Sequence, residues 1–392
     1  MYVLLADKQT FREKGRGQCE KEMCRYGKSS GRSGNYSTNY QISGRELMTP
    51  DEVRGERPVM DFKYDILKHP NVKLTADGGQ PPYIHGEPTQ AVAKLGGETA
   101  DYVKKTNSST IVDSVTVDGN VYGVPFTTNT WFMYYDKSKF SESDVKSLDT
   151  MLSKNKVAFN ITEGWYMSTF YLANGCSYFG KDGKDNSAGI DISGDKGTQA
   201  TQAMVSFVNN PNFVNDLQGV GIAGLRDGSV GAYFSGSWDY KSVKEILGNN
   251  FGAVSLPTLK IGGTDKQLKS FAGSKAIAVN PNCKYQQVAV ALAKYLGGKD
   301  AQQSHYELRG VIPCNTELLA TDAIKKDALV TAQNDTFNKT SVIQPTVSGM
   351  NDYWTPAQNF AKAVVNGEVT LDNAAAKTQD FYKQINTSIV SK

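Results

Sequence analysis

The chain has 392 residues, of which 39% are hydrophobic and 21% charged, which is enough for two or more domains with cores of their own. Its net charge is +3, and residues 1–86 hold 14 basic against 11 acidic residues, which leaves 29 of each sign in the remainder. A neutral body argues against nucleic acid as a partner, and no apolar run approaches the roughly 20 residues that a membrane helix needs.

The first segment of the chain, residues 1–92, differs in composition from the rest. It is rich in Arg, contains no Trp, and carries a low-complexity stretch at 27–35 that predicts loop or disorder. Met1–Ala6 is too short for the apolar region of a signal peptide, and Cys19 is not preceded by small apolar residues. As written, the chain has no recognisable export signal or lipobox.

The five cysteines are odd in number and lack the spacing of a zinc site. They predict free thiols, three of them small core residues. We expect neither a metal nor a cofactor.

From about Ala93 onwards the pattern alternates between strands and helices. A hairpin is predicted over 115–122, turning at Asp118-Gly119, because Asp-Gly favours the tight turn that joins two strands. Strands follow over 124–126 and 131–135, and helical periodicity covers 199–208, 288–295, 359–365 and 371–385. The stretch 182–187 lacks calcium-loop spacing and predicts a hairpin tip. The pattern as a whole predicts an α/β fold.

The four tryptophans all lie in the last two thirds of the chain, each beside turn-forming or polar residues: Trp131, Trp165, Trp238 and Trp354. Gly, Ser or Asn next to an indole leaves one ring face open, and a sugar presents an apolar face that stacks on such a ring. Sugar hydroxyls would then need polar groups at the rim, for which Glu163, Asp239, Asn129 and Asn351 are candidates. Each tryptophan taken alone is more often a core residue, and Trp131, in a compact aromatic strand, is the strongest core candidate.

A series of motifs resembles the extracellular solute-binding proteins of ABC importers, with the maltose and maltodextrin branch nearest. The series begins with Asp118-Gly-Asn-Val-Tyr-Gly-Val-Pro-Phe126 and Phe132-Met-Tyr-Tyr-Asp-Lys-Ser138. It continues in the family's order with 159–166, 232–238, 254–257, 271–281, 310–313 and 350–354. The resemblance covers about 300 residues.

The resemblance implies a periplasmic-binding-protein-like two-lobe fold and a set of sugar contacts. It places the ligand carboxylate and adjoining aromatics on Glu163, Trp165 and Tyr166, and the large stacking rings on Trp238 and Trp354. Asn129 stands where relatives often have a carboxylate, and Trp131 completes the substrate-binding set. It also implies ABC permease subunits as partners, a monomeric chain, and a place at the cell surface or in the periplasm.

The lobes are expected to be built from separate stretches of chain. The small, N-terminal lobe takes 93–128 and 272–322, and the large, C-terminal lobe takes 129–271 and 323–392. Nothing in residues 1–92 resembles the family's opening strands, so we expect the small lobe to be incomplete and the first segment to be unrelated and partly disordered. Residues 34–71 resemble the C-terminal end of conjugal-transfer coupling proteins, which suggests a chimeric reading frame.

Three alternatives to a sugar-binding protein remain. A glycoside hydrolase acting on α-glucans would need two carboxyl groups across the scissile bond, and Glu163, Asp239 and Asp352 are candidates without a distinctive spacing. A DNA-conjugation factor would need a nucleotide site that the sequence lacks. The third alternative is a non-functional chimera.

Overall fold

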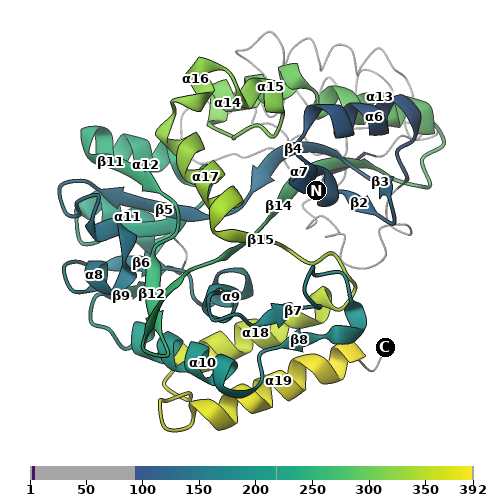
Figure 1. Cartoon of the computed structure of the whole chain (residues 1–392). Helices are drawn as coiled ribbons and strands as arrows, with labels where there is room; N and C mark the ends of the chain where they lie inside the picture. The colour runs from purple at the N-terminus through teal and green to yellow at the C-terminus, as the bar shows by residue number, and fades with distance from the viewer. Residues whose placement is uncertain (1, 5–92, 218, 391–392) are drawn as a thin grey trace, which may run out of the picture.

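A computed structural model describes residues 2–4, 93–217 and 219–390 of the chain. Within these ranges the strands form two main sheets, and helices pack around both (Figure 1). Strand β4 (Val124–Asn129) belongs to one sheet and leads through Thr130 and Trp131 into β5 (Phe132–Asp136) of the other. The chain therefore passes from one sheet to the other within a few residues.

The larger sheet has five strands of mixed direction. In order across the sheet they are β11 (Phe251–Val254), β5, β10 (Ala232–Ser235), β6 (Val157–Phe159) and β9 (Phe213–Asn215). β5 pairs antiparallel with β10 and β11, whereas β10, β6 and β9 are mutually parallel. Both faces of this sheet are buried. Successive side chains of a strand point to opposite faces, so Met133 and Tyr135 of β5 enter one core, and Phe132 and Tyr134 enter the other.

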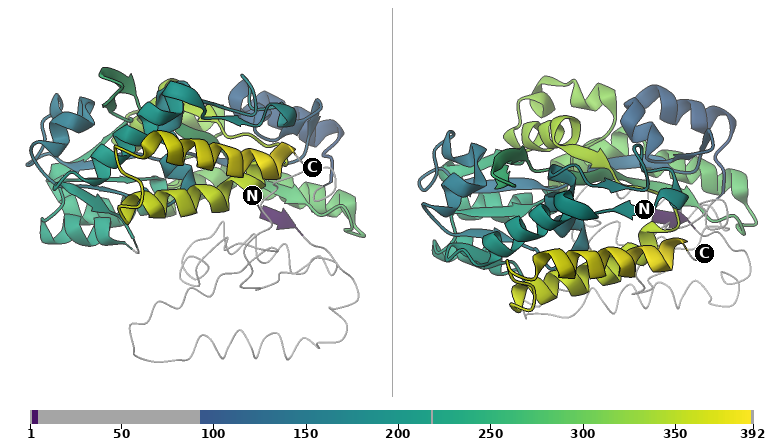
Figure 2. Two further views of the ribbon diagram at one scale, coloured as in Figure 1. Left: turned by 90° about the horizontal axis from the view of Figure 1, so that it is seen from below. Right: turned by 60° about the horizontal axis from the view of Figure 1, so that its bottom comes forward.

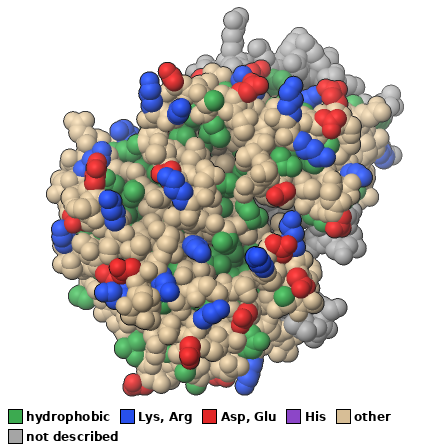
Figure 3. Space-filling model, viewed as in Figure 1, with side chains coloured by type: hydrophobic (Ala, Val, Ile, Leu, Met, Phe, Trp, Pro, Cys, Tyr) green, Lys and Arg blue, Asp and Glu red, His purple; other side chains and the backbone are tan. Residues whose placement is uncertain are grey.

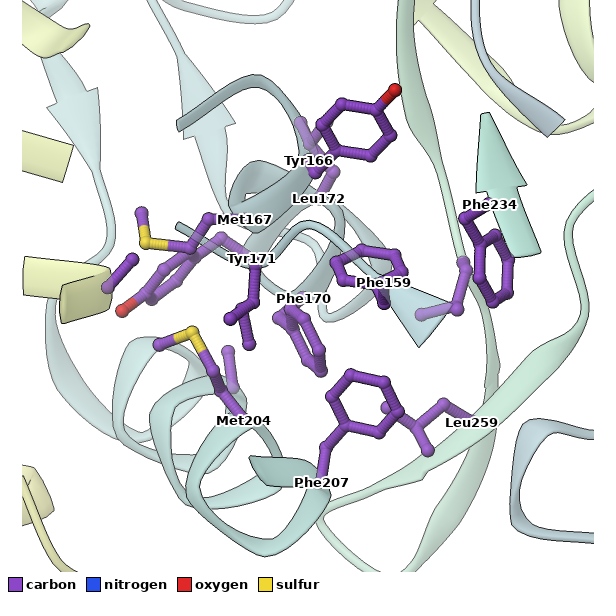
Figure 4. Close-up of a cluster of buried hydrophobic side chains, with 14 of the residues drawn as sticks. Phe159, Tyr166, Met167, Phe170, Tyr171, Leu172, Met204, Phe207, Phe234 and Leu259 are labelled. Atoms are coloured by element: carbon purple, nitrogen blue, oxygen red, sulfur yellow. The ribbon is translucent and has the colours of Figure 1, made fainter. Parts of the chain in front are cut away.

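Helices cover the two faces of this sheet as two separate groups. One face packs on α9 (Gly164–Ala173), α10 (Gly194–Val208), α18 (Met350–Val365) and α19 (Ala374–Val390). The other packs on α11 (Val220–Asp227), α12 (Tyr240–Leu247) and α17 (Ala328–Lys339). In the first core Phe159 lies among Phe170, Phe207 and Phe234, while Tyr166 lies at the edge with its hydroxyl directed outwards (Figure 4). Helices α18 and α19 run side by side along the outside (Figure 2).

The second sheet is organised by one long strand, β14 (Ser270–Val279). Its first part pairs with β15 (Ser341–Ile343), its middle with β4, and its end with β1 (Tyr2–Leu4). Its core joins Ile277 and Val279 to residues of α6 (Gly97–Thr106) and α13 (Gln286–Leu296). Helix α14 (Lys299–Arg309) follows α13.

The pairing of β1 corrects one sequence-based expectation. The first segment, residues 1–92, is predicted to be unrelated to the family's fold, yet Tyr2, Val3 and Leu4 pair in parallel with Ile277, Ala278 and Val279. Strand pairing depends on backbone hydrogen bonds, and Tyr, Val and Leu suit a strand. A short strand can therefore form here although its sequence matches no motif of the family. Residues 5–92, with the predicted disorder and the coupling-protein resemblance, lie outside the described residues.

Most of the predicted elements are present, although the helices α18 and α19 begin at residues other than those predicted. The hairpin forms as β2 (Thr116–Val117) and β3 (Asn120–Val121), with Asp118 and Gly119 both at positive φ, as the tight turn requires. The predicted tip at 182–187 lies between the antiparallel strands β7 (Ser177–Tyr178) and β8 (Ile190–Asp191). Helix α19 begins later than predicted, because Asn373 accepts a hydrogen bond from the Thr370 backbone and so competes with helix formation there.

Helix α18 begins earlier than predicted, at Met350. Its first turns contain residues that disfavour a helix, including Pro356. They are held in place because Met350, Tyr353 and Ala357 are fully buried against the core. Trp354 therefore lies on a helix.

The described residues hold further features that bear on the sequence-based expectations. Cys176, Cys283 and Cys314 are buried, as predicted for three of the cysteines. No helix among the described residues combines the length and apolarity needed to cross a membrane. The residue ranges assigned to the two lobes remain a prediction.

Candidate functional site

The N-terminus of α9 and the first half of α18 meet at Gly164. A Cβ placed on Gly164 would lie 3.1 Å from Ala357 Cβ and 3.4 Å from Trp354 Cε3. The Tyr353 hydroxyl donates to the Gly164 carbonyl at 3.3 Å. Because Gly164 has no side chain, the two helices approach closely, and this brings Trp354 beside the turn that carries Glu163 and Trp165.

Trp165 in turn faces Trp238, which follows β10 in the short helix η3 (Ser237–Asp239). The two ring centroids are 6.2 Å apart and the planes are inclined by 36°. Trp238 is 45% exposed, an unusual value for so large an apolar side chain, and Trp165 is half-buried. We call Trp165, Trp238 and Trp354 the tryptophan platform.

The position of Trp238 depends on a glycine. A Cβ on Gly236 would lie 2.1 Å from Trp238 Cζ3, so the ring occupies the space that any side chain at 236 would need. The Gly236 carbonyl also accepts a hydrogen bond of 2.8 Å from the Tyr134 hydroxyl. The loop that presents the exposed indole is thus anchored to the sheet below it.

Polar groups with fixed geometry lie beside the platform. Asp239 accepts hydrogen bonds from the Tyr233 hydroxyl at 2.9 Å and from Ser235 Oγ at 2.5 Å. Asp216, almost fully buried, accepts from the Gly221 backbone at 2.7 Å. Its pKa is raised by burial and further by the nearby charge of Asp239.

Tyr166 is buried close enough to this acidic group to feel its charge. Burial raises the pKa of its hydroxyl, and the charges of Asp239, Asp216 and Glu163 raise it further. The hydroxyl therefore stays protonated and can donate a hydrogen bond. Glu163 itself is exposed at the start of α9.

Trp131 does not belong with the other tryptophans. Its side chain is fully enclosed and packs on Phe159, Tyr166 and Phe234, with ring centroids 4.9–5.9 Å apart. The prediction that Trp131 binds substrate is wrong, because an enclosed ring offers no face to a sugar. The alternative prediction, that Trp131 is a core residue, agrees with the structure. Its neighbour Asn129 is half-buried at the end of β4, opposite Gly273 of β14.

Several residues that shape this region have no role predicted from the sequence. Tyr233, Ser235 and Gly236 lie within the motif at 232–238, but only their hydrogen bonds and contacts reveal what they do. Asp216 comes from a separate segment and had no local signal. On the face drawn in Figure 3, hydrophobic side chains gather near the middle of the molecule, with charged side chains around them.

A cavity of about 410 Å³ lies away from the platform, between α10 and the hairpin of β12 (Thr258–Ile261) and β13 (Thr264–Gln267). Its lining includes Gln199, Gln202 and Asn210, and its only aromatic lining residue is Phe207, whose ring is buried in the core. It offers no exposed stacking ring, and we do not include it in the site.

The fold and the exposed aromatic platform together define a solute-binding protein. The model of the bacterial extracellular solute-binding protein family matches residues 75–332, so the chain belongs to that family. The matched range includes residues 75–92, which are predicted from the sequence to belong to the unrelated first segment.

Relatives and solved structures agree with this family. A maltooligosaccharide ABC transporter solute-binding lipoprotein of Streptococcus pneumoniae is 24% identical, over 92% of this chain and 84% of its own. A galactooligosaccharide-binding protein of Bacillus subtilis is 26% identical, over 70% of each chain. A solved structure of a protein with acarbose is 53% identical and has a TM-score of 0.74, covering 76% of this chain and 79% of its own.

Proposed function

We propose that this chain is the sugar-binding component of an ABC importer and that it binds malto-oligosaccharides on the tryptophan platform. The sugar's apolar face stacks on Trp238, Trp165 and Trp354, and its hydroxyls bond with Glu163, Tyr166 and Asn129. Permease subunits receive the loaded protein at the cell surface or in the periplasm.

The observation that carries this proposal is the convergence of three tryptophans from distant parts of the chain. Trp354 and Trp165 meet across Gly164, and Trp165 meets Trp238 with 6.2 Å between ring centroids. A half-exposed indole in a folded protein leaves apolar area in contact with water, which a stacked sugar would cover. The choice of malto-oligosaccharides is supported by the Streptococcus pneumoniae relative and by the 53% identical protein with acarbose.

The site binds and does no chemistry in this proposal. Asp239 holds two hydrogen bonds from its own neighbours, which fixes it as an acceptor at the rim of the platform. The relatives found are binding proteins, which further supports a binding function. Release of reducing ends from maltoheptaose by the unaltered chain would instead favour a hydrolase.

The test is titration calorimetry of the full chain with maltotriose, acarbose and a β-linked galacto-oligosaccharide. We expect maltotriose and acarbose to bind and the galacto-oligosaccharide to bind at least tenfold more weakly. Trp238→Ala should weaken maltotriose binding, whereas the matched control Tyr295→Ala, which removes a ring exposed to a similar degree (48%) elsewhere, should not. Tighter binding of the galacto-oligosaccharide would refute the ligand class, and equal effects of the two substitutions would refute the platform.

A further inference from the structure

One segment of the long strand β14 opens towards the surface. The strand has ten residues, buried at both ends and only half-buried at Gly273, Ser274 and Lys275. Its pairing with β4 becomes irregular between Lys275 and Ala276. Such irregularities redirect side chains and are frequent beside functional sites.

The register places Lys275 on the same face of the sheet as Asn129. Gly273 lies opposite Asn129 and Lys275 opposite Thr127, and residues directly opposite in an antiparallel pair project to the same side. Lys275 and Asn129 are therefore diagonal neighbours on one face, at the point where β4 leaves this sheet for the other.

Lys275 reaches from this sheet to the tryptophan platform. Its Nζ lies 5.5 Å from the centroid of the Trp238 ring, in a cation–π contact. Trp238 belongs to the segment that follows β10 of the larger sheet, so the contact joins the two sheets. A lysine stem is flexible, and the ammonium can move by an ångström or two without any change in the backbone.

The ammonium complements the carboxylates near the platform. When ionised, the carboxylates of Asp239 and Glu163 accept hydrogen bonds and cannot donate them, whereas an ammonium donates hydrogen bonds and cannot accept them. A sugar hydroxyl does both. A sugar ring stacked on Trp238 would thus have an acceptor in Asp239 and a donor in Lys275 of β14.

We propose that Lys275 is a sugar-binding residue, which donates from Nζ to a hydroxyl of the unit stacked on Trp238. This inference rests on the proposed function. On binding, the ammonium exchanges its contact with the ring for a charge-assisted hydrogen bond, which is the stronger of the two interactions.

The experiment compares Lys275→Met, Lys275→Arg and a matched control in the full chain by titration calorimetry with maltotriose. Methionine keeps an unbranched stem without the charge, and we expect about a tenfold loss of affinity. Arginine keeps a donor, and we expect at most about a threefold loss. The control is Lys244→Met on α12, which removes an ammonium 4.6 Å from the centroid of the Phe251 ring and should leave binding unchanged.

A second measurement separates hydrogen bonding from mere support of the Trp238 ring. The unaltered and Lys275→Met chains are titrated with monodeoxy maltotrioses that each lack one hydroxyl. We expect the tenfold ratio between the chains to fall close to one for the sugar that lacks the contacted hydroxyl. A residue that only holds the ring would give the same ratio with every deoxy sugar.

Two results would overturn the inference alone: equal affinity of the unaltered and Lys275→Met chains for maltotriose, or an unchanged ratio across all deoxy sugars. If Trp238→Ala still weakens binding in those cases, the proposed function stands without Lys275. Failure of the unaltered chain to bind maltotriose would refute the proposed function itself, and with it this inference.

Discussion

Substitution of Gly236 by alanine should displace the exposed indole of Trp238 while leaving the backbone unstrained. Gly236 has φ −113° and ψ −172°, an extended conformation that any residue adopts. The added methyl would lie 2.1 Å from Trp238 Cζ3 and 2.2 Å from Cη2, so the ring must swing away. The platform would then lose its most exposed member.

The size of the effect follows from the exposed area. An indole side chain offers about 250 Å² of surface, so its exposed 45% is about 110 Å² and contributes about 3 kcal/mol if fully covered. A sugar covers one ring face, which gives about half of this, or roughly a tenfold loss of affinity. The unfolding free energy should change by less than about 1 kcal/mol, because the ring moves at the surface.

The assay is calorimetric titration of maltotriose with Gly236→Ala, Trp238→Ala and the double variant, together with urea unfolding. Gly236→Ala and Trp238→Ala should lose similar affinity, and the double variant should lose no more than Trp238→Ala alone. The matched control is Gly96→Ala, at φ −107° with nothing within 4 Å of the added Cβ. Binding by Gly236→Ala at the unaltered strength, or additive losses in the double variant, would refute the reasoning.

Three further predictions concern single side chains. Glu163→Gln should weaken maltotriose binding by roughly 1–2 kcal/mol, the difference between charged and neutral hydrogen bonds, and calorimetry that finds no change would remove Glu163 from the site. Trp131→Ala should lower the unfolding free energy by about 3–5 kcal/mol because it empties part of the core, and a urea denaturation curve shifted no further than that of Trp238→Ala would contradict its core position. Burial raises the pKa of Asp216 in the folded protein above its unfolded value near 4. The ionised carboxyl therefore lowers the unfolding free energy as pH rises from about 4 through the folded pKa, and it has no effect at lower pH, where the carboxyl is protonated in both states. Asp216→Asn, which keeps an acceptor for Gly221, should therefore lose less stability than the unaltered chain between about pH 4 and pH 7 in urea unfolding, and parallel profiles would refute this.

The strands and the exposed tryptophans could be predicted from local sequence patterns. Asp118-Gly119 and the aromatic run at 131–135 carry their structural preferences in adjacent residues, so a local pattern suffices. Trp238 was recognisable because Gly and Ser precede it, and the same Gly236 proves to be the residue that makes room for its ring.

The parts that the sequence could not predict depend on contacts between distant residues. Trp165 and Trp354 are neighbours only because α9 and α18 close on Gly164 and Ala357, which are far apart in the chain. Helix α18 begins at Met350 despite Pro356, since burial of Tyr353 outweighs weak local propensity. Lys275 carries no motif, and only the register of β14 and the distance to Trp238 bring it to notice.

The separation of Trp131 from the tryptophan platform gives the protein an optical property. Indole emission shifts with the polarity around the ring, and the four indoles occupy two kinds of surroundings: one fully enclosed, the others at or near the surface. Covering the platform would move the emission of the three outer rings to shorter wavelength while Trp131 stays constant as an internal reference. If sugar binds on the platform as proposed, the chain would report its own occupancy without a dye or a label.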